Sequence, residues 1–279
     1  MACGHPPPMR GSVVTPIIHL HVLASGSKGN AVIVDGPDGS VLIDCGISRR
    51  QVLVRAKELA VDVGRIRCVL LTHEHGDHIT GLPVFAKHAG VPMFATAGTV
   101  AASTKLSVLP FTLVGHSDAF ELPGTGLVAQ AFPTSHDVAD PMGFRLSALD
   151  ADGCEADALG YCTDTGLLTD EAPTALRGCR ILALEANHDP RMLATGDYPG
   201  FLKARIGGET GHLSNAQAAE ALPQLVTEDT ETVIAMHLSA ENNRPSVCRR
   251  TLEAALEGFG AGPGTRVAIA AQDAPLTVW

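Results

Sequence analysis

The most informative segment of the chain is Thr72-His73-Glu74-His75-Gly76-Asp77-His78. It places three imidazoles and a carboxylate within six positions, directly after the short apolar run Cys68-Val69-Leu70-Leu71, which predicts a buried strand. Neutral imidazole and carboxylate suit Zn²⁺, Mn²⁺ or iron without any thiolate. The spacing therefore favours an open metal site at the end of a strand over a chance histidine cluster on a solvated loop.

Composition bounds the class of protein. The 279 residues are enough for one large α/β domain or two small ones, and the 45% hydrophobic content allows a sizeable core. Seven cysteines without a CxxC pair indicate free thiols in a reducing compartment, so we expect a cytoplasmic protein. No apolar run approaches membrane-spanning length. Residues 1–16, with three consecutive prolines, are expected to form a disordered leader, and 17–279 a single domain.

Short apolar runs alternate with turns along the rest of the chain. Strands are expected at residues 17–23, 31–34, 41–43, 160–163, 180–184, 232–236 and 266–270, and a hairpin turn over 150–157. Capping boxes at Ser48 and Ser214 predict helices that run towards Leu59 and Leu222. Further helices are expected over 79–89 and 246–257. This alternation, without repeats or a long linker, indicates one α/β domain.

Three more metal-competent side chains fall at or near predicted strand ends. Asp164 directly follows the strand 160–163, His237 follows the strand 232–236, and His136 lies between Ser135 and Asp137. Loops at strand ends of α/β proteins can converge on one site. A lone histidine there would ordinarily be structural, but beside the histidine-rich segment metal ligation is the better interpretation.

The order of these residues resembles that of the metallo-β-lactamase superfamily, and the match extends over nearly the whole chain from about Ile17. The resemblance implies an αββα sandwich, in which two mixed β-sheets pack together with helices outside. The sequence departs slightly from the pattern of the family at Gly76, where many relatives carry a hydroxylated or other small residue. Five loop sequences resemble those of the YycJ/WalJ-like branch in particular: 23–30, 44–48, 185–189, 211–215 and 237–243. That branch is associated with 5′-to-3′ exonuclease activity on double-stranded DNA.

The resemblance also implies roles for individual residues. One metal ion would be held by His73, His75 and His136, a second by Asp77, His78 and His237, and Asp164 would bridge the two. The expected cofactors are two divalent ions, Zn²⁺ or Mn²⁺, with iron also chemically suitable. Such a pair can activate water and stabilise the oxygens of a phosphodiester during displacement. Asp77 can also orient the attacking water and is therefore predicted to be catalytic.

Residues outside this set have open roles. His212 lies just before the second capping box, where it is predicted to bind a phosphate or protonate the leaving oxygen; the alternative is a structural histidine packed on the helix. His188, with Glu185 and Asn187, either contacts substrate or fixes a loop. Asp44 either accepts a hydrogen bond from a ligating imidazole or serves as a turn carboxylate.

The formal charge of −10 is awkward for a protein that acts on DNA, because polyanions are normally met by basic surfaces. A local basic rim would be needed around the site. Three clusters are candidates, each equally consistent with a solvated helix face: Arg49, Arg50, Arg55 and Lys57, then Arg191, Lys203 and Arg205, then Arg244, Arg249 and Arg250.

Three functional classes follow from these observations. The leading one is a metal-dependent phosphodiesterase, a 5′-to-3′ exonuclease with double-stranded DNA as its partner. The alternative is a hydrolase of small esters, thioesters or lactones on the same fold, since fold alone does not decide function. A non-catalytic binding module is disfavoured, because no ligand position is missing.

Overall fold

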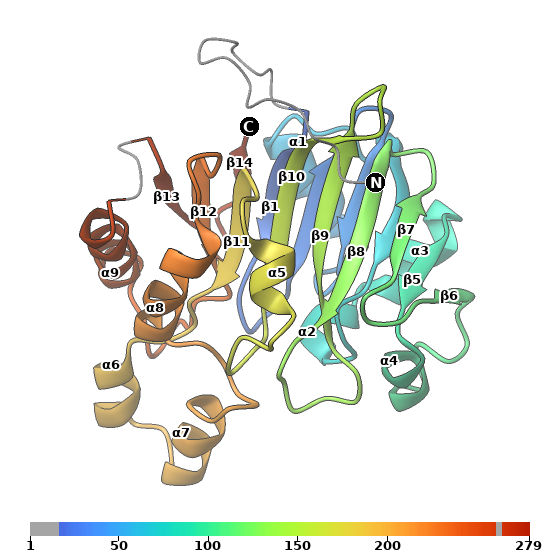
Figure 1. Cartoon of the computed structure of the whole chain (residues 1–279). Helices are drawn as coiled ribbons and strands as arrows, with labels where there is room; N and C mark the ends of the chain where they lie inside the picture. Colours follow the sequence, from blue (N-terminus) through green and yellow to red (C-terminus); the bar gives the residue numbers. More distant parts are fainter. Residues whose placement is uncertain (1–16, 261–263) are drawn as a thin grey trace.

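A computed structural model describes residues 17–260 and 264–279, so the leader expected over 1–16 lies outside the described residues. Two seven-stranded mixed sheets pack face to face with helices on their outer faces, which is the expected αββα sandwich (Figure 1). Among the described helices, none combines the length and apolar character needed to span a bilayer. The cytoplasmic location stays a prediction.

The first sheet has the strand order β14-β1-β2-β3-β4-β5-β6. Its strands are β1 His19–Ala24, β2 Ala31–Asp35, β3 Ser40–Ile43, β4 Ile66–Leu70, β5 Met93–Ala95, β6 Phe111–Leu113 and β14 Leu276–Val278. Strands β1 to β3 pair antiparallel, whereas β3 to β6 pair parallel. The chain therefore leaves β3 and β4 at the same edge of the sheet.

The second sheet has the order β13-β12-β11-β10-β9-β8-β7. Its strands are β7 Ala119–Leu122, β8 Leu127–Pro133, β9 Met142–Leu149, β10 Glu155–Cys162, β11 Ile181–Glu185, β12 Thr232–Met236 and β13 Arg266–Ile269. Strands β10 to β13 are parallel, so their carboxyl ends also lie side by side.

Helices lie outside the two sheets. They are α1 Arg49–Glu58, α2 Gly76–Ile79, α3 Leu82–Ala89, α4 Ala97–Ala102, α5 Ala172–Leu176, α6 Pro190–Thr195, α7 Gly200–Ile206, α8 Asn215–Leu225 and α9 Pro245–Gly258, with a 3₁₀ turn at Val63–Arg65. Aliphatic side chains of α1 and α3 pack on the first sheet, and those of α5, α8 and α9 pack on the second. The layer between the sheets is mostly Val, Leu, Ile and Ala, as the low aromatic content requires.

Most sequence-based boundaries agree with the structure, and both capping boxes are formed. Two expectations were wrong in part. The helix expected over 79–89 is divided into α2 and α3 at Gly81, because the backbone there lies against the loop after β3: a Cβ on Gly81 would lie 1.9 Å from the carbonyl oxygen of Ile47. The hairpin turn expected over 150–157 is shorter, since β10 already begins at Glu155.

Candidate metal centre

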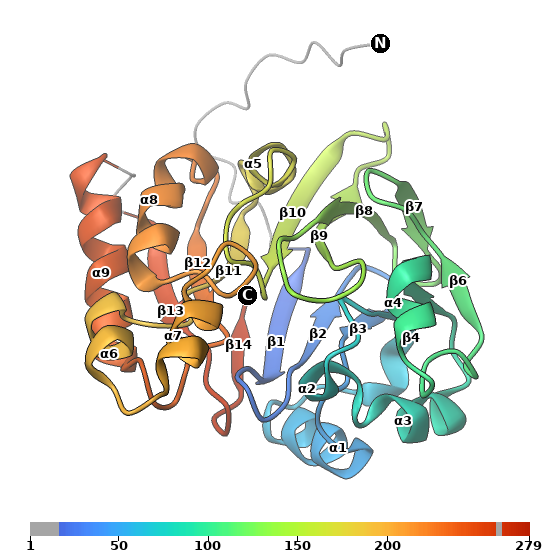
Figure 2. The same cartoon turned by 90° about the horizontal axis from the view of Figure 1, so that it is seen from below.

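Loops that follow parallel strands of both sheets meet at one edge of the sandwich. In the first sheet, β3 leads to Asp44 and β4 leads to the histidine-rich segment 73–78. In the second sheet, β10, β11 and β12 end next to Asp164, Glu185 and His237. Figure 2 views the molecule from the side on which α2 and α7 lie. Residues distant in sequence therefore share one site, as the strand-end argument predicts.

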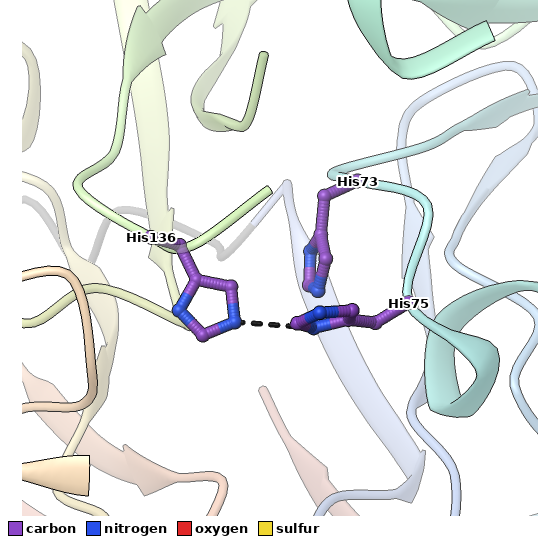
Figure 3. A group of neighbouring side chains, drawn as sticks. All are labelled: His73, His75 and His136. Atoms are coloured by element: carbon purple, nitrogen blue, oxygen red, sulfur yellow. Dashed lines mark hydrogen bonds between the residues drawn. The ribbon is translucent and has the colours of Figure 1, made fainter. Parts of the chain in front are cut away.

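The first group of side chains is His73, His75 and His136, which point towards one another (Figure 3). One ring nitrogen of each lies within 4.8 Å of those of the other two. Nε2 of His136 is 3.2 Å from Nδ1 of His75. His73 and His75 of the 73–78 segment thus meet His136, which reaches the centre from the loop after β8.

The second group is Asp77, His78 and His237, whose donor atoms also lie within 4.8 Å of one another. Oδ2 of Asp77 is 3.6 Å from Nε2 of both His78 and His237. Asp164 lies between the groups: its Oδ2 is 3.3 Å from Nε2 of His78, and its Oδ1 is 3.8 Å from Nε2 of His136. The structure therefore brings together all seven side chains that the sequence proposed as ligands.

Unpaired buried nitrogens show that these residues fit a cation. Nε2 of His73 and Nε2 of His237 are buried, and neither has a hydrogen-bond partner among the described residues. Leaving such a group unpaired in the interior costs about 1–3 kcal/mol. Imidazole nitrogens and carboxylate oxygens converging on a common point form the donor set that divalent transition metals prefer.

Local electrostatics keep two of the donors, His73 and Asp164, in the protonation state that a metal needs, whereas at His78 and His237 the Asp164 carboxylate outweighs burial and raises the pKa of the imidazole. Burial, together with the charge of His78, holds the pKa of His73 well below its ordinary value, so that this ring is neutral. Burial alone would raise the pKa of Asp164, but His237 and His78 outweigh it and hold that pKa well below its usual range. The site thus offers a neutral imidazole and an ionised carboxylate.

The backbone is strained at three of the strand ends that form the site. Asp44, Asp164 and His237 have φ of 57°, 56° and 55°, in the left-handed region that residues other than glycine rarely occupy. Each costs on the order of 1–3 kcal/mol, which the surrounding contacts must offset. Strain of this kind concentrates at functional sites because it fixes the direction of a side chain.

The loop after β3 holds the histidine-rich segment in place. The amide of Cys45 donates to the carbonyl oxygen of His78, and Gly46 lies so close to Asp77 that a Cβ on Gly46 would be 1.6 Å from its carbonyl oxygen. Oδ2 of Asp44 accepts a hydrogen bond from Nδ1 of His78 at 2.7 Å. Of the two roles open for Asp44, the geometry favours the acceptor that orients a ligating imidazole.

Comparison with known proteins agrees with this geometry. Residues 40–238 match the family described as the beta-lactamase superfamily domain. The chain belongs to the metallo-β-lactamase superfamily. Within the superfamily it is 32% identical to the exodeoxyribonuclease YycJ of Bacillus anthracis over 249 residues, which are 88% of this chain and 92% of that protein. It is 30% identical to the exodeoxyribonuclease WalJ of Streptococcus pneumoniae strain D39 over 247 residues, 87% and 90% of the two chains.

A solved structure shows the same superfamily fold. The metallo-β-lactamase fold protein YhfI of Bacillus subtilis superposes with a TM-score of 0.67 at 18% identity, over 94% of this chain and 99% of that chain. At this level of identity the likeness concerns the fold alone.

Glu185 is a buried member of the site whose role the sequence did not reveal. Its Oε1 accepts from Nδ1 of His212 at 2.8 Å and from Nδ1 of His237 at 3.1 Å, while its Oε2 accepts from the amides of Thr165 and Leu213. Its position in the sequence groups Glu185 with the loop of His188. The feature that could have indicated a role for Glu185 in the site is its position at the end of β11, which lies between the strands that lead to Asp164 and His237.

His212 borders the cavity beside this centre. The cavity measures about 280 Å³ and is also lined by Asp77, His136 and Asp164. Because Nδ1 of His212 is bonded to Glu185, its Nε2 is the nitrogen left for a substrate. Burial lowers the pKa of His212, but the Glu185 carboxylate outweighs burial and leaves that pKa raised.

His188 lies in a different setting. It is buried, its segment forms a β-bridge with Ser214, and its carbonyl oxygen accepts from the amide of Asn215. Burial lowers the pKa of His188 to about 4. It is not among the described residues that line the cavity. The geometry therefore favours the loop-fixing interpretation over substrate contact.

Proposed function

We propose that the chain is a dinuclear metal-dependent hydrolase of phosphodiester bonds, and that it shortens linear double-stranded DNA from the 5′ end. The observation that carries the hydrolase assignment is two largely buried groups of metal-competent side chains with Asp164 between them. The DNA substrate is supported by similarity to two proteins named exodeoxyribonucleases over most of their length.

The donor groups suggest how two ions would be held. His73, His75 and His136 would bind one ion, and Asp77, His78 and His237 the other. Asp164, which approaches both groups with its two oxygens, would bridge them. Zn²⁺ and Mn²⁺ are the ions we expect. When bound, such a pair supplies Lewis-acid activation of water and of the phosphodiester.

The chain's own residues then divide the remaining work. The Asp77 carboxylate lines the cavity and is partly exposed, so it can orient the attacking water. The raised pKa of His212, which comes from Glu185 outweighing burial, favours the form with a proton on Nε2, from which it can pass to the leaving oxygen. Glu185 holds the His212 ring in the orientation that makes this transfer possible.

The test compares labelled DNA with the substrates of the alternative class. Metal-loaded protein is incubated with 5′-labelled and 3′-labelled linear duplexes, and separately with a panel of thioesters and lactones. We expect metal-dependent loss of DNA from the 5′ end, and Asp77→Ala protein prepared identically serves as the control for contaminating nucleases. Efficient thioester or lactone turnover with inert DNA would replace the nuclease by the small-ester hydrolase.

The dinuclear assignment has a test of its own. Elemental analysis of gently purified protein, followed by titration of the metal-free form, should saturate at two ions per chain. Saturation at a single ion would contradict the shared role of Asp164.

A further inference from the structure

One wall of the cavity comes from α7, which with α6 forms a protruding pair of short helices. We define the α6–α7 lobe as residues 190–206, which lie in the chain between β11 and α8. Figure 1 shows α6 and α7 at the bottom of the molecule, standing off the sandwich. Leu202, Arg205 and Ile206 line the cavity, and their spacing of i, i+3 and i+4 shows that one face of α7 is turned towards it.

Phe201 stands on α7 beside that face with little covering it. Its side chain is 77% exposed. The exposed ring of Trp279, by contrast, packs edge-on against His19 and His21, and no ring contact of this kind involves Phe201 among the described residues. Phe201 and Arg205 are i and i+4 on the helix, so their side chains are neighbours about one 5.4 Å turn apart.

The α6–α7 lobe carries positive charge in an acidic protein. It has three basic side chains, Arg191, Lys203 and Arg205, against the single acid Asp197, although the whole chain carries −10. Lys203 donates to the carbonyl oxygen of Ala194, and no carboxylate among the described residues pairs with it. This is the local basic rim that binding of a polyanion requires.

The side chain of Arg205 is held at the cavity with donors free to bind a phosphate. Its Nε donates to Oδ2 of Asp137, the neighbour of His136, which fixes the side chain at the cavity. Neither terminal nitrogen has a hydrogen-bond partner among the described residues. A guanidinium held by one edge presents its remaining donors in the fork that suits a phosphate.

We propose that Phe201 forms a nucleobase-stacking subsite, on which a base next to the scissile phosphate lies while Arg205 holds a flanking phosphate. This inference rests on the proposed function, because it assigns the DNA substrate of the same site a place on α7. A base has an apolar face attached to an anionic backbone, and the α6–α7 lobe offers an exposed ring next to cationic groups. Stacking on a ring tolerates every base, as an enzyme that removes successive nucleotides requires.

A protein partner fits the α6–α7 lobe less well. The other large apolar and aromatic side chains of the lobe are buried or half-buried: these are Met192, Leu193, Tyr198, Leu202 and Ile206. Among the described residues of the lobe, Phe201 is therefore an isolated exposed apolar group, and apolar docking surfaces are contiguous patches.

Photocrosslinking tests the contact directly. A duplex with 5-iodouracil at its 5′ end, and with phosphorothioate linkages that slow cleavage, is irradiated with the metal-loaded protein. The adduct is mapped by mass spectrometry of the peptides. We expect the adduct on Phe201 and its loss in Phe201→Ala protein. Adducts confined to other aromatic residues, such as Phe259 or Trp279, would overturn the subsite.

Binding and turnover provide the second readout. Phe201→Ala should weaken duplex binding roughly 5- to 150-fold, the loss expected for one base–aromatic stack, and Phe201→Tyr should retain wild-type affinity. In Phe201→Ala protein, the ratio of DNA turnover to turnover of a small chromogenic phosphodiester should fall along with the affinity for duplex DNA. Phe259→Ala is the matched control: Phe259 is 36% exposed at the end of α9 and is not among the described residues that line the cavity.

The outcomes separate the two proposals. If wild-type protein cleaves the small diester and leaves DNA intact, the DNA substrate fails and the subsite fails with it. If wild-type protein degrades DNA and Phe201→Ala matches it, only the subsite is overturned. A change in the oligomeric mass of Phe201→Ala protein with unaltered DNA binding would assign the ring to contact between copies of the chain, and would likewise overturn the subsite.

Discussion

Asp44 and His78 form a fully buried hydrogen-bonded pair in which Nδ1 of the imidazole lies 2.7 Å from Oδ2 of the carboxylate. The amide of Thr72 donates to the other oxygen of Asp44 at 2.8 Å. The pair fixes the His78 ring so that its Nε2 faces Asp164. A residue at the end of β3 in the first sheet thus sets the direction of a proposed ligand.

Asp44→Asn should weaken metal binding by roughly 10–100-fold, as expected when the acceptor behind a ligating histidine is lost. Asparagine tolerates the left-handed backbone at this position, so the change preserves the backbone and acts on the hydrogen bonds of the carboxylate with His78 and Thr72. Competition with a chelator measures the affinity. Asp35→Asn is the matched control, because Asp35 pairs with the buried His21 in a pair that belongs to none of the donor groups. Equal affinities in the two variants would contradict the orienting role of Asp44.

Much of the candidate site could be predicted because its donors are dense in sequence or follow recognisable strands. The 73–78 segment needs no tertiary information, and Asp164 and His237 follow apolar runs whose ends are visible. Glu185 could not be assigned in the same way. Its role depends on β11 lying between β10 and β12, and no local pattern encodes that strand order.

The elements of the fold could likewise be predicted only where a local sequence pattern encodes them. Ser48 and Ser214 were sufficient to locate the starts of α1 and α8, because capping is a local interaction. The helices α6 and α7 have only six and seven residues, too short for a helical period to stand out. The break between α2 and α3 depends on the contact of Gly81 with Ile47, which only the folded chain creates.

His212→Ala should lower kcat on the order of 10²-fold, the usual effect of removing a general acid. Metal content should not change, because the residue is outside both proposed donor groups. Steady-state kinetics and elemental analysis provide the two readouts. Loss of an ion would make His212 a ligand and put His237 in question. A lower melting temperature with normal kcat would assign His212 a structural role.

Glu185→Gln should move the alkaline limb of the pH–rate profile to lower pH. Burial lowers the pKa of His212, and the charge of Glu185 reverses this and raises it. Activity that needs the acid form of His212 is therefore present below its raised pKa and is lost as pH rises through that pKa. Without the carboxylate the pKa falls, and the loss begins earlier. The profiles are compared at saturating metal, and an unshifted alkaline limb would show that His212 is not the titrating acid.

Gly46→Ala and Gly76→Ala should differ strongly in stability although both lie beside the proposed ligands. The Cβ on residue 46 would clash with the backbone of Asp77, so we expect a loss of about 1–3 kcal/mol or more. At residue 76 a Cβ meets only Oγ1 of Thr80, at 3.7 Å, so the change should stay within about 0.5 kcal/mol. Thermal melting of the metal-free proteins compares them. Equal melting temperatures would show that the loop after β3 is not packed as tightly as the contact implies.

Arg205→Gln should weaken duplex binding and flatten its dependence on salt. Each phosphate contact contributes about 0.9 to the slope of log K against log salt, so losing one should reduce the slope by about 1. Arg50→Gln is the matched control, because this exposed side chain stands on α1 and is not among the described residues that line the cavity. Arg55 is less suitable, since it is engaged with Asp273 and the carbonyl oxygens of Leu23 and Gln272. A larger change of slope in the α1 variant would move the DNA path from the α6–α7 lobe to α1.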